Sequence, residues 1–303
     1  MKRNKNPKAE KMVIKKSRKI LEKINLRSRS VKTKTMQISL DKKVTNVSSK
    51  NLQEKLSFPG DFKNKIICGD IIEILKQIPD GAIDLIITSP PYNLKNSTGN
   101  GMKDGRGGKW ANAALKNGYT NHNDCMPHDE YVKWQRDCLT EMIRIIPEDG
   151  AIFYNHKWRV QGGLLQDRQD IVGGFPVRQI IIWRRKGGLN FNTGYFLPTY
   201  EVIYLIAKPK FKLRIKANAH GDVWEFTQEM NNEHPAAFPV ALIDRIVAST
   251  DAKTILDPFM GSGTTAISAI NFRRNYVGID ISPEYCVMAE KRIKKHISQG
   301  KLL

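Results

Sequence analysis

Residues 65–89 read KIICGDIIEILKQIPDGAIDLIITS, and this stretch decides the fold. Two apolar runs, at 65–70 and 82–89, have the length of buried strands, and residues 71–78 between them have helical spacing. A strand, a helix and a strand in this order form a βαβ unit, whose two strands run parallel in one sheet. The stretch therefore predicts an α/β protein in which helices cover both faces of a parallel sheet.

The same alternation continues along the chain and returns at its end. An amphipathic helix is expected at 128–146 and a strand at 151–155. The expected elements of the last third are helices at 239–250, 264–271 and 283–298 and strands at 254–257 and 275–280. Because both ends of the chain alternate in this way, we expect one doubly wound sheet that is built from both.

The positive charge of the chain is concentrated at its start. Residues 1–50 hold 17 Lys and Arg against 3 Asp and Glu, and the whole chain has a formal net charge of +20. This composition, without any aromatic residue, favours a disordered basic arm, which we place at 1–60, ahead of a folded domain at 61–300. Such an arm would add salt-sensitive affinity for a polyanion, and the alternative is a leader with no specific role.

Composition also excludes several classes of protein. No stretch approaches the roughly 20 apolar residues that span a bilayer, and no signal-peptide core follows the basic start. We therefore expect a soluble, cytoplasmic protein without membrane contact. The cysteines are scattered without a CxxC pair, so buried thiols are expected at Cys68, Cys138 and Cys286, and no metal site is predicted.

A glycine turn joins a strand to a helix in the last third. Residues 255–265 read ILDPFMGSGTT, with Asp257 at the strand tip and Gly261 and Gly263 before the helix. Glycine permits a close approach of a ligand to the backbone, and the helix N-terminus offers free N–H groups. Neither a GxxxxGK[ST] loop nor a GxGxxG fingerprint is present, which disfavours a polyphosphate. Asp280 ends the next strand, where it can accept both hydroxyls of a ribose, so the unit predicts a nucleoside-type cofactor.

Residues 87–93 read ITSPPYN and end the second apolar run with two prolines. Neither proline can donate a backbone hydrogen bond or extend a central strand, and in isolation the pair indicates a rigid turn. Residues 95–128 then lose all periodicity and are rich in Gly, Asn and Lys. A loop of this length within a compact domain is usually functional or disordered, and we expect a flexible loop here.

These motifs resemble those of the amino-methylating DNA methyltransferases. DPFMGSGTT (257–265) with GIDIS (278–282) looks like their S-adenosylmethionine site, and TSPPYN (88–93) looks like their catalytic motif. The catalytic motif comes first and the cofactor motif (255–282) last, an order similar to that of the beta group. The resemblance covers roughly residues 62–298 and implies a Rossmann-like, S-adenosylmethionine-dependent methyltransferase fold with permuted motif order and an inserted DNA-recognition segment.

The resemblance also implies a set of residues around the cofactor. Asp70 would lie near the adenine, and HPAAFP (234–239) would pack against the methionine end. The implied cofactor-binding residues are Asp70, His234, Phe238, Asp257, Phe259, Gly261, Ser262, Gly263, Thr264 and Asp280.

The chemistry of amine methylation suggests roles within the SPPY motif. An exocyclic amine is a poor nucleophile because its lone pair is delocalised into the ring, and two hydrogen-bond acceptors around it would localise that pair. We expect the Ser89 hydroxyl and the Pro90 carbonyl to be these acceptors, held in place by the rigid dihedrals of Pro90 and Pro91. Tyr92 would stack on a base flipped from the duplex. Methylation at carbon 5 of cytosine is disfavoured, since no cysteine lies near this turn.

The sequence defines the target base and the DNA contacts less narrowly than it defines the two motifs. Ser89 after Thr88 resembles the cytosine-N4 members more than the adenine-N6 members, which usually carry Asp or Asn there, so cytosine is favoured and adenine is the alternative. Target recognition is expected at about 184–233, and His156 and Lys157 are further candidate contacts, though more structural than catalytic. The predicted DNA-binding residues are Arg184, Arg185, Lys186, Lys208, Lys210 and Lys212.

The predicted function is methylation of specific double-stranded DNA by a prokaryotic or phage-encoded enzyme in a restriction-modification or epigenetic role. A second copy of the chain, in a homodimer, and a cognate restriction endonuclease are candidate partners. One alternative is methylation of RNA or of a protein amide, and another is an inactive DNA-binding relative. The intact Ser89, Tyr92, Asp257 and glycine turn argue against inactivity, and the basic recognition segment favours DNA over a protein amide and, less strongly, over RNA.

Overall fold

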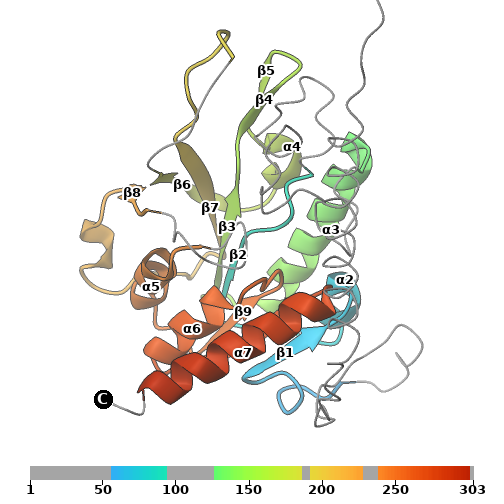
Figure 1. Cartoon of the computed structure of the whole chain (residues 1–303), viewed down its shortest axis with the longest axis vertical. Coiled ribbons are helices and arrows are strands. Elements are labelled where there is room, and N and C mark those ends of the chain that lie inside the picture. Colours follow the sequence, from blue (N-terminus) through green and yellow to red (C-terminus); the bar gives the residue numbers. More distant parts are fainter. Residues whose placement is uncertain (1–55, 94–125, 186–191, 228–237, 301–303) are drawn as a thin grey trace, which may run out of the picture. The chain divides into compact units, whose positions relative to one another are not determined.

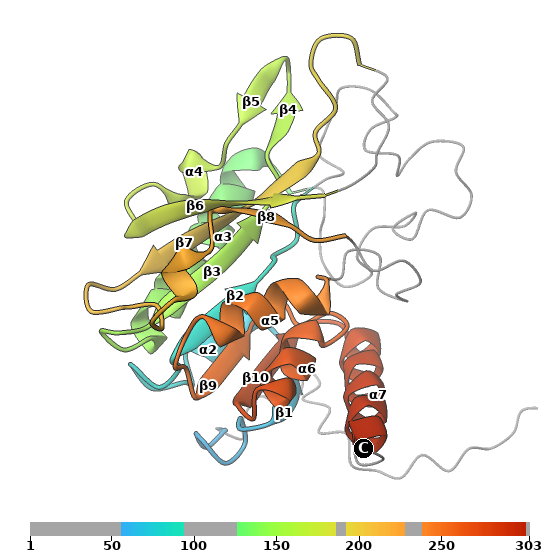
Figure 2. The ribbon, with the colours of Figure 1, turned by 90° about the vertical axis from the view of Figure 1, so that its left-hand side faces the viewer.

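The computed structural model describes residues 56–93, 126–185, 192–227 and 238–300. Within these residues the main sheet has eight strands in the order β1-β10-β9-β2-β3-β7-β6-β8 (Figures 1 and 2). The strands are β1 (Lys65–Cys68), β2 (Leu85–Thr88), β3 (Ala151–His156), β6 (Val177–Arg184), β7 (Tyr200–Ala207), β8 (Val223–Glu225), β9 (Thr254–Asp257) and β10 (Asn275–Asp280). The helices are α2 (Ile71–Leu75), α3 (His128–Ile145), α4 (Gln169–Val172), α5 (Val240–Ala248), α6 (Thr264–Asn271) and α7 (Pro283–Gly300).

The sheet is mostly parallel and is built from both ends of the chain. β1, β10, β9, β2 and β3 run in one direction, and β7 is antiparallel to its neighbours β3 and β6. The late strands β9 and β10 lie between the early strands β1 and β2. The prediction of one doubly wound α/β sheet is therefore confirmed.

Helices cover both faces of the sheet, as the apolar runs require. In β2, Ile86 packs in one core cluster with residues of α2 and α3, while its neighbours Leu85 and Ile87 pack in another with residues of α5. Successive side chains of a strand point to opposite faces, so a strand buried on both faces has no polar alternation. In Figures 1 and 2, α2, α3 and α4 lie on one side of the sheet and α5, α6 and α7 on the other.

The chain reverses its winding between β2 and β9, which are neighbours in the sheet. From β2 it passes through α3 to β3 on one side, and from β9 it passes through α6 to β10 on the other side. Such a point opens a crevice at the carboxyl ends of the strands, and ligands of doubly wound proteins bind there. The topology thus directs attention to the residues that follow Thr88 and Asp257.

Some expected boundaries are wrong. Residues 56–60 were expected in the arm, but the Leu56 amide donates to Gln77 Oε1 (3.0 Å), and the Phe58 ring lies 5.6 Å from the Phe62 ring. The rest of the expected arm lies outside the described residues. So does most of the expected loop at 95–128, whose last residue, His128, already begins α3.

Two further elements belong to the middle of the chain. A hairpin of β4 (Arg159–Gln161) and β5 (Leu164–Gln166) follows β3, and a short 3-10 helix, η3 (Ala217–Ala219), precedes β8. The sequence predicted neither, because three-residue elements leave no periodic pattern. Among the helices that the structure describes, none is long and apolar enough to cross a membrane.

Candidate active site

The two predicted motifs leave adjacent strands at the same edge of the sheet, and Asp257 connects them. Its carboxylate accepts a hydrogen bond from Thr88 Oγ1 (3.2 Å), beside the SPPY turn, and one from Thr265 Oγ1 (2.6 Å), in the first turn of α6. The Phe259 amide donates to the same carboxylate (3.1 Å). Burial raises the pKa of Asp257 to about 6. Its observed partners are thus internal, and its contact with a cofactor stays a prediction.

The glycine turn leads from β9 into α6 and contacts the end of β10. Gly261 and Gly263 have φ values of 51° and 81°, a region that glycine adopts without strain. The Gly261 amide donates to Asp280 Oδ2 (2.8 Å), and the Ser282 amide donates to Asp280 Oδ1 (2.9 Å). Burial raises the pKa of Asp280. Each carboxylate oxygen has lone pairs for further donors, so a ribose diol fits this site chemically.

An arginine that the sequence analysis missed holds this turn from outside. Arg292, on α7, places Nη1 3.0 Å from Ser262 Oγ, 3.2 Å from the Ser262 carbonyl and 2.8 Å from Thr264 Oγ1. Ser262 and Thr264 were predicted to bind the cofactor, and the structure shows both residues buried, with their hydroxyls paired to Arg292. They therefore fix the turn, and backbone groups are what this part of the turn can present to a ligand.

The remaining residues that were predicted to bind the cofactor lie in different surroundings. Asp70 caps α2 by accepting from the Glu73 amide (3.1 Å), and the neighbouring Gly69 amide donates to the Asp280 carbonyl (3.0 Å), so Asp70 and Asp280 share one edge. Phe259 packs edge-on against Trp134 of α3 at 5.7 Å. Phe238 is buried before α5, with its ring 6.0 Å from that of Trp183. His234 lies outside the described residues.

The SPPY turn belongs to a hydrogen-bonded network of four side chains. Ser89 Oγ lies 2.7 Å from the Tyr92 hydroxyl, which lies 3.2 Å from Glu201 Oε2 at the start of β7. Asn155 Nδ2, near the end of β3, donates to the Tyr92 hydroxyl (2.6 Å) and to Glu201 Oε2 (2.8 Å), and it lies 3.3 Å from Ser89 Oγ. Glu201 Oε1 is 3.1 Å from Arg185 Nη1. The network joins the predicted catalytic motif to β3, to β7 and to Arg185, which follows β6.

Helix α3 makes the SPPY turn rigid from the other side. The Pro91 carbonyl accepts from the Tyr131 hydroxyl (2.8 Å) and from Gln135 Nε2 (3.3 Å). Asn93, with φ of 53°, exchanges two hydrogen bonds with the backbone of Met126, just before α3 (2.8 and 2.9 Å). Asparagine tolerates this left-handed conformation better than most residues. Residues 89–93 make no regular turn of their own, and the segment that carries the two prolines is held in place by these contacts with α3 and Met126.

The predicted DNA-binding residues separate into two groups. Arg184 ends β6 and Arg185 follows it, at the edge that carries the SPPY turn. Arg184 is paired with Glu225, and Arg185 is paired with Glu201. Lys208 follows β7, which runs the opposite way, so Lys208, Lys210 and Lys212 lie at the other edge of the sheet. These three lysines are therefore excluded from an interface formed around Ser89. Lys186 lies outside the described residues.

His156 was a candidate DNA contact, and the structure excludes it. Its side chain is 1% exposed, with Nε2 2.8 Å from the Tyr131 hydroxyl and the ring 4.7 Å from the Tyr92 ring. Burial holds the pKa of His156 well below its ordinary value, so the ring is neutral. It supports Tyr92 by packing. Lys157, which follows β3 and is partly exposed, stays a predicted DNA contact.

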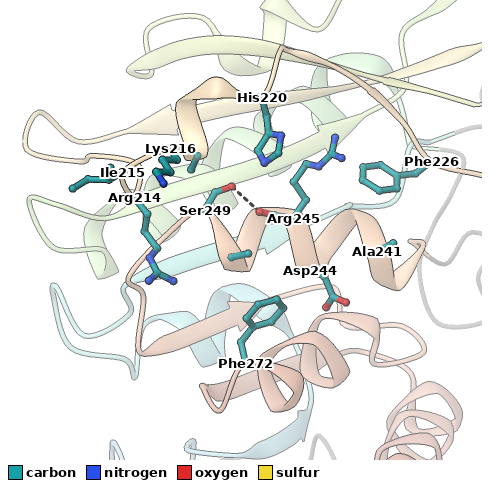
Figure 3. A pocket seen from close by; sticks show the side chains of 12 residues that line it. Arg214, Ile215, Lys216, His220, Phe226, Ala241, Asp244, Arg245, Ser249 and Phe272 are labelled. Carbon is teal, nitrogen blue, oxygen red and sulfur yellow. Dashed lines mark hydrogen bonds between the residues drawn. The ribbon is translucent and has the colours of Figure 1, made fainter.

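A cavity of about 500 Å³ lies along α5, away from both motifs (Figure 3). Its wall carries Arg214, Lys216, His220 and Arg245, together with the rings of Phe226 and Phe272. The Arg245 guanidinium stacks on the Phe226 ring at 4.6 Å. No residue of the SPPY turn or of the glycine turn lines this cavity, so it is a separate feature of the domain.

Comparison with known proteins identifies the family. The sequence model of the DNA methylase family N6_N4_Mtase matches residues 83–291. The chain belongs to this family. The methylase is 30% identical over 275 residues to the Type II methyltransferase M.BglII of Bacillus subtilis, a match that covers 77% of this chain and 69% of that protein. It is 27% identical to M.HpaI of Haemophilus parainfluenzae, over 76% of this chain and 74% of that one.

Solved structures share the fold of the methylase. The cytosine-N4-specific PvuII DNA methyltransferase aligns with a TM-score of 0.58 at 18% identity, covering 74% of this chain and 84% of that chain. A putative DNA modification methylase of Thermus thermophilus, in complex with S-adenosyl-L-methionine, aligns with a TM-score of 0.57 at 19% identity, covering 77% and 94%. Family and fold together confirm the predicted resemblance, the fold class and the class of enzyme, a DNA methyltransferase.

Two groups of side chains at this site were not predicted. Asn155 lies near the end of β3 and Glu201 near the start of β7, and both strand ends are at the edge that carries the SPPY turn. In the sequence, each is a polar residue beside an apolar run, and this was the only pattern from which they could have been predicted. Arg292 lies in a helix rich in charged residues and left no such signal. Only the fold brings these residues to the two motifs.

Proposed function

We propose that this methylase transfers the methyl group of S-adenosyl-L-methionine to the exocyclic amine of a flipped base in specific double-stranded DNA. The single observation that carries the proposal is the hydrogen bond between Thr88 and Asp257, which places the SPPY turn and the glycine turn side by side at the switch point of the sheet. A cofactor at one turn and a base at the other would meet within one crevice.

The cofactor supplies a methyl group on a sulfonium, which is a good electrophile. Asp280 is proposed to accept its ribose hydroxyls, and Asp70 is proposed to lie beside its adenine. The first amides of α6 and the turn at Gly261 and Gly263 are proposed to hold the remainder. Because Arg292 of α7 holds the side chains of Ser262 and Thr264, the turn is positioned before a ligand arrives.

The base would be held and activated by the SPPY turn. The Ser89 hydroxyl and the Pro90 carbonyl are proposed to accept hydrogen bonds from the amine, which localises its lone pair towards the methyl group. The Tyr92 ring is proposed to stack on the flipped base, and such stacking is worth about 1–3 kcal/mol. Cytosine N4 is the favoured target because Ser89 occupies the first position of the motif, with adenine N6 as the alternative.

Binding to DNA is proposed to involve Arg184 at the catalytic edge and the basic residues at the start of the chain. The named relatives are Type II methyltransferases of bacteria, which supports a restriction-modification role in the cytoplasm of a bacterial cell. A cognate endonuclease would then recognise the same DNA site.

Transfer of a radiolabelled methyl group from the cofactor to plasmid DNA tests this proposal. The wild-type protein is expected to label DNA. Ser89→Ala and Tyr92→Ala should lower the single-turnover rate far more than they weaken cofactor binding measured by calorimetry. Ser298→Ala, on an exposed turn of α7, is the matched control. Wild-type rates in Ser89→Ala and Tyr92→Ala would show that the chemistry lies elsewhere.

A further inference from the structure

Glu201 is a buried carboxylate at the edge of the sheet where the proposed methylation occurs. Its side chain is 9% exposed, and it lies on β7, outside both recognised motifs. A buried carboxylate is costly unless charge and hydrogen bonds compensate it, and Arg185 supplies both at 3.1 Å. Oε2 faces Tyr92 and Asn155. The Glu201–Arg185 pair is thus connected to the SPPY turn through Tyr92.

The hydrogen-bond directions in the network follow from its donors. Asn155 must point its amide nitrogen at Glu201, because its oxygen there would face the carboxylate with no proton between them. The Tyr92 hydroxyl accepts from Asn155, so its own proton can go to Glu201 Oε2. The Ser89 proton can then go to the Tyr92 oxygen, 2.7 Å away. The chain of donors from Ser89 through Tyr92 thus ends at Glu201, and Ser89 Oγ can also accept from Asn155 Nδ2 (3.3 Å).

This arrangement has a consequence for the attacking amine. With its own proton directed to Tyr92, Ser89 Oγ keeps a lone pair for an N–H of the target base. Asn155 Oδ1 is buried and has no hydrogen-bond partner among the described residues, which is a cost that native proteins tend to keep at functional sites. The network thus orients Ser89 as an acceptor.

We propose that Glu201 is the terminal proton acceptor of a relay that runs from the amine through Ser89 and Tyr92, an inference that rests on the proposed function. As the amine nitrogen forms its bond to the methyl carbon and the carbon–sulfur bond breaks, the nitrogen becomes cationic. Its N–H proton passes to Ser89 Oγ, the Ser89 proton passes to the Tyr92 oxygen, and the Tyr92 proton passes to Glu201 Oε2. The electron pair of the broken bond stays on sulfur, so the products are a neutral methylamine, a neutral thioether and a protonated Glu201, which returns its proton to solvent.

Glu201 acts through Ser89 and Tyr92 and is a positioning residue. Arg185 is the charged group that faces it, and the ring of His156 beside Tyr92 is neutral. The proposal gives the Tyr92 hydroxyl a task that its ring alone would not have. It also assigns Arg185 to the relay and not to a base contact.

The test compares Tyr92→Phe, Glu201→Gln and the double variant in single-turnover methylation at saturating cofactor and DNA. Each single variant is expected to lower the rate by about 100-fold, the lower end of the range for a positioned proton-transfer group. The double variant should be no slower than the slower single variant, because both changes break one relay. The wild type should react more slowly in deuterium oxide, and this isotope effect should vanish in Tyr92→Phe. Glu148→Gln, an exposed Glu near Lys208 at the opposite edge, is the control and should keep the wild-type rate.

A readout without cofactor or DNA tests the network itself. In the free protein, the side-chain amide protons of Asn155 should exchange slowly with solvent by nuclear magnetic resonance, and Glu201→Gln should accelerate their exchange. A wild-type rate in either Tyr92→Phe or Glu201→Gln would overturn the relay, and so would multiplied effects in the double variant. An inactive wild type with slow Asn155 exchange would instead overturn the proposed function and the relay built on it.

Discussion

Replacing Asp257 by Asn is expected to change how the stability of the protein depends on pH. Burial raises the pKa of this carboxyl from its ordinary value of 3.8 to about 6 in the folded protein. The folded state therefore binds the proton more tightly than the unfolded state. The contribution of the group to stability is complete below pH 3.8 and is lost as the pH rises through 6. A shift of two units corresponds to about 3 kcal/mol, of which roughly 2 kcal/mol is lost between pH 4.5 and 7.5.

The variant keeps the shape of the site while removing its titration. Asn can accept from Thr88 and from the Phe259 amide through Oδ1, and it can donate to Thr265 through Nδ2. Urea unfolding at pH 4.5 and 7.5 gives the free energy of unfolding of each protein. The advantage of Asp257→Asn over wild type should grow by about 2 kcal/mol from the lower to the higher pH.

A matched control separates this effect from a general change in charge. Asp251 has a side chain that is 82% exposed and is paired with Arg214, so Asp251→Asn should follow the wild type at both pH values within about 0.5 kcal/mol. The free energy of unfolding of the wild type should change between the two pH values by about 2 kcal/mol more than that of Asp257→Asn. If both proteins changed by the same amount, the pKa of the carboxyl would not be near 6 and our account of its burial would be wrong.

Three other changes test the cofactor turn and the basic start of the chain. Arg292→Ala should lower the free energy of unfolding by about 2–3 kcal/mol and weaken cofactor binding, because buried hydroxyls lose a charged donor. Its control is Lys294→Ala, whose side chain is 79% exposed and which should change the free energy of unfolding by less than about 0.5 kcal/mol in the same urea titration. Asp280→Ala should weaken cofactor binding by roughly 1–3 kcal/mol in calorimetry, and an unchanged affinity would remove it from the site. Deleting residues 1–50 should leave the thermal unfolding transition in place and reduce DNA affinity mainly at low salt, whereas a protein that failed to fold would show that this segment belongs to the core.

The sequence predicted the sheet and both motifs, because each rests on a local pattern. The strands and helices of the last third were expected within a few residues, since apolar runs, the glycine turn and the acids at 257 and 280 punctuate them clearly. The early helix was expected at 71–78 but ends at Leu75, and such ends depend on tertiary contacts.

What the sequence could not reveal are contacts between distant segments. Tyr92 and Glu201 are 109 residues apart, and only the antiparallel strand β7 brings them together. Because β7 runs antiparallel to β3 and β6, Lys208 at its end lies at the edge opposite Arg184, although both residues lie in similarly basic stretches of sequence. Charge alone therefore indicated a nucleic-acid surface without showing which part of it faces the site.

The most direct test of the central claim is the identity of the methylated nucleoside. The protein is incubated with S-adenosyl-L-methionine carrying a deuterated methyl group and with DNA of mixed sequence, and the DNA is digested and analysed by mass spectrometry. Our account predicts N4-methylcytosine, or N6-methyladenine in the alternative, with the deuterium label and with a strong loss in Ser89→Ala. Label found only in 5-methylcytosine, or no label in any nucleoside, would contradict it.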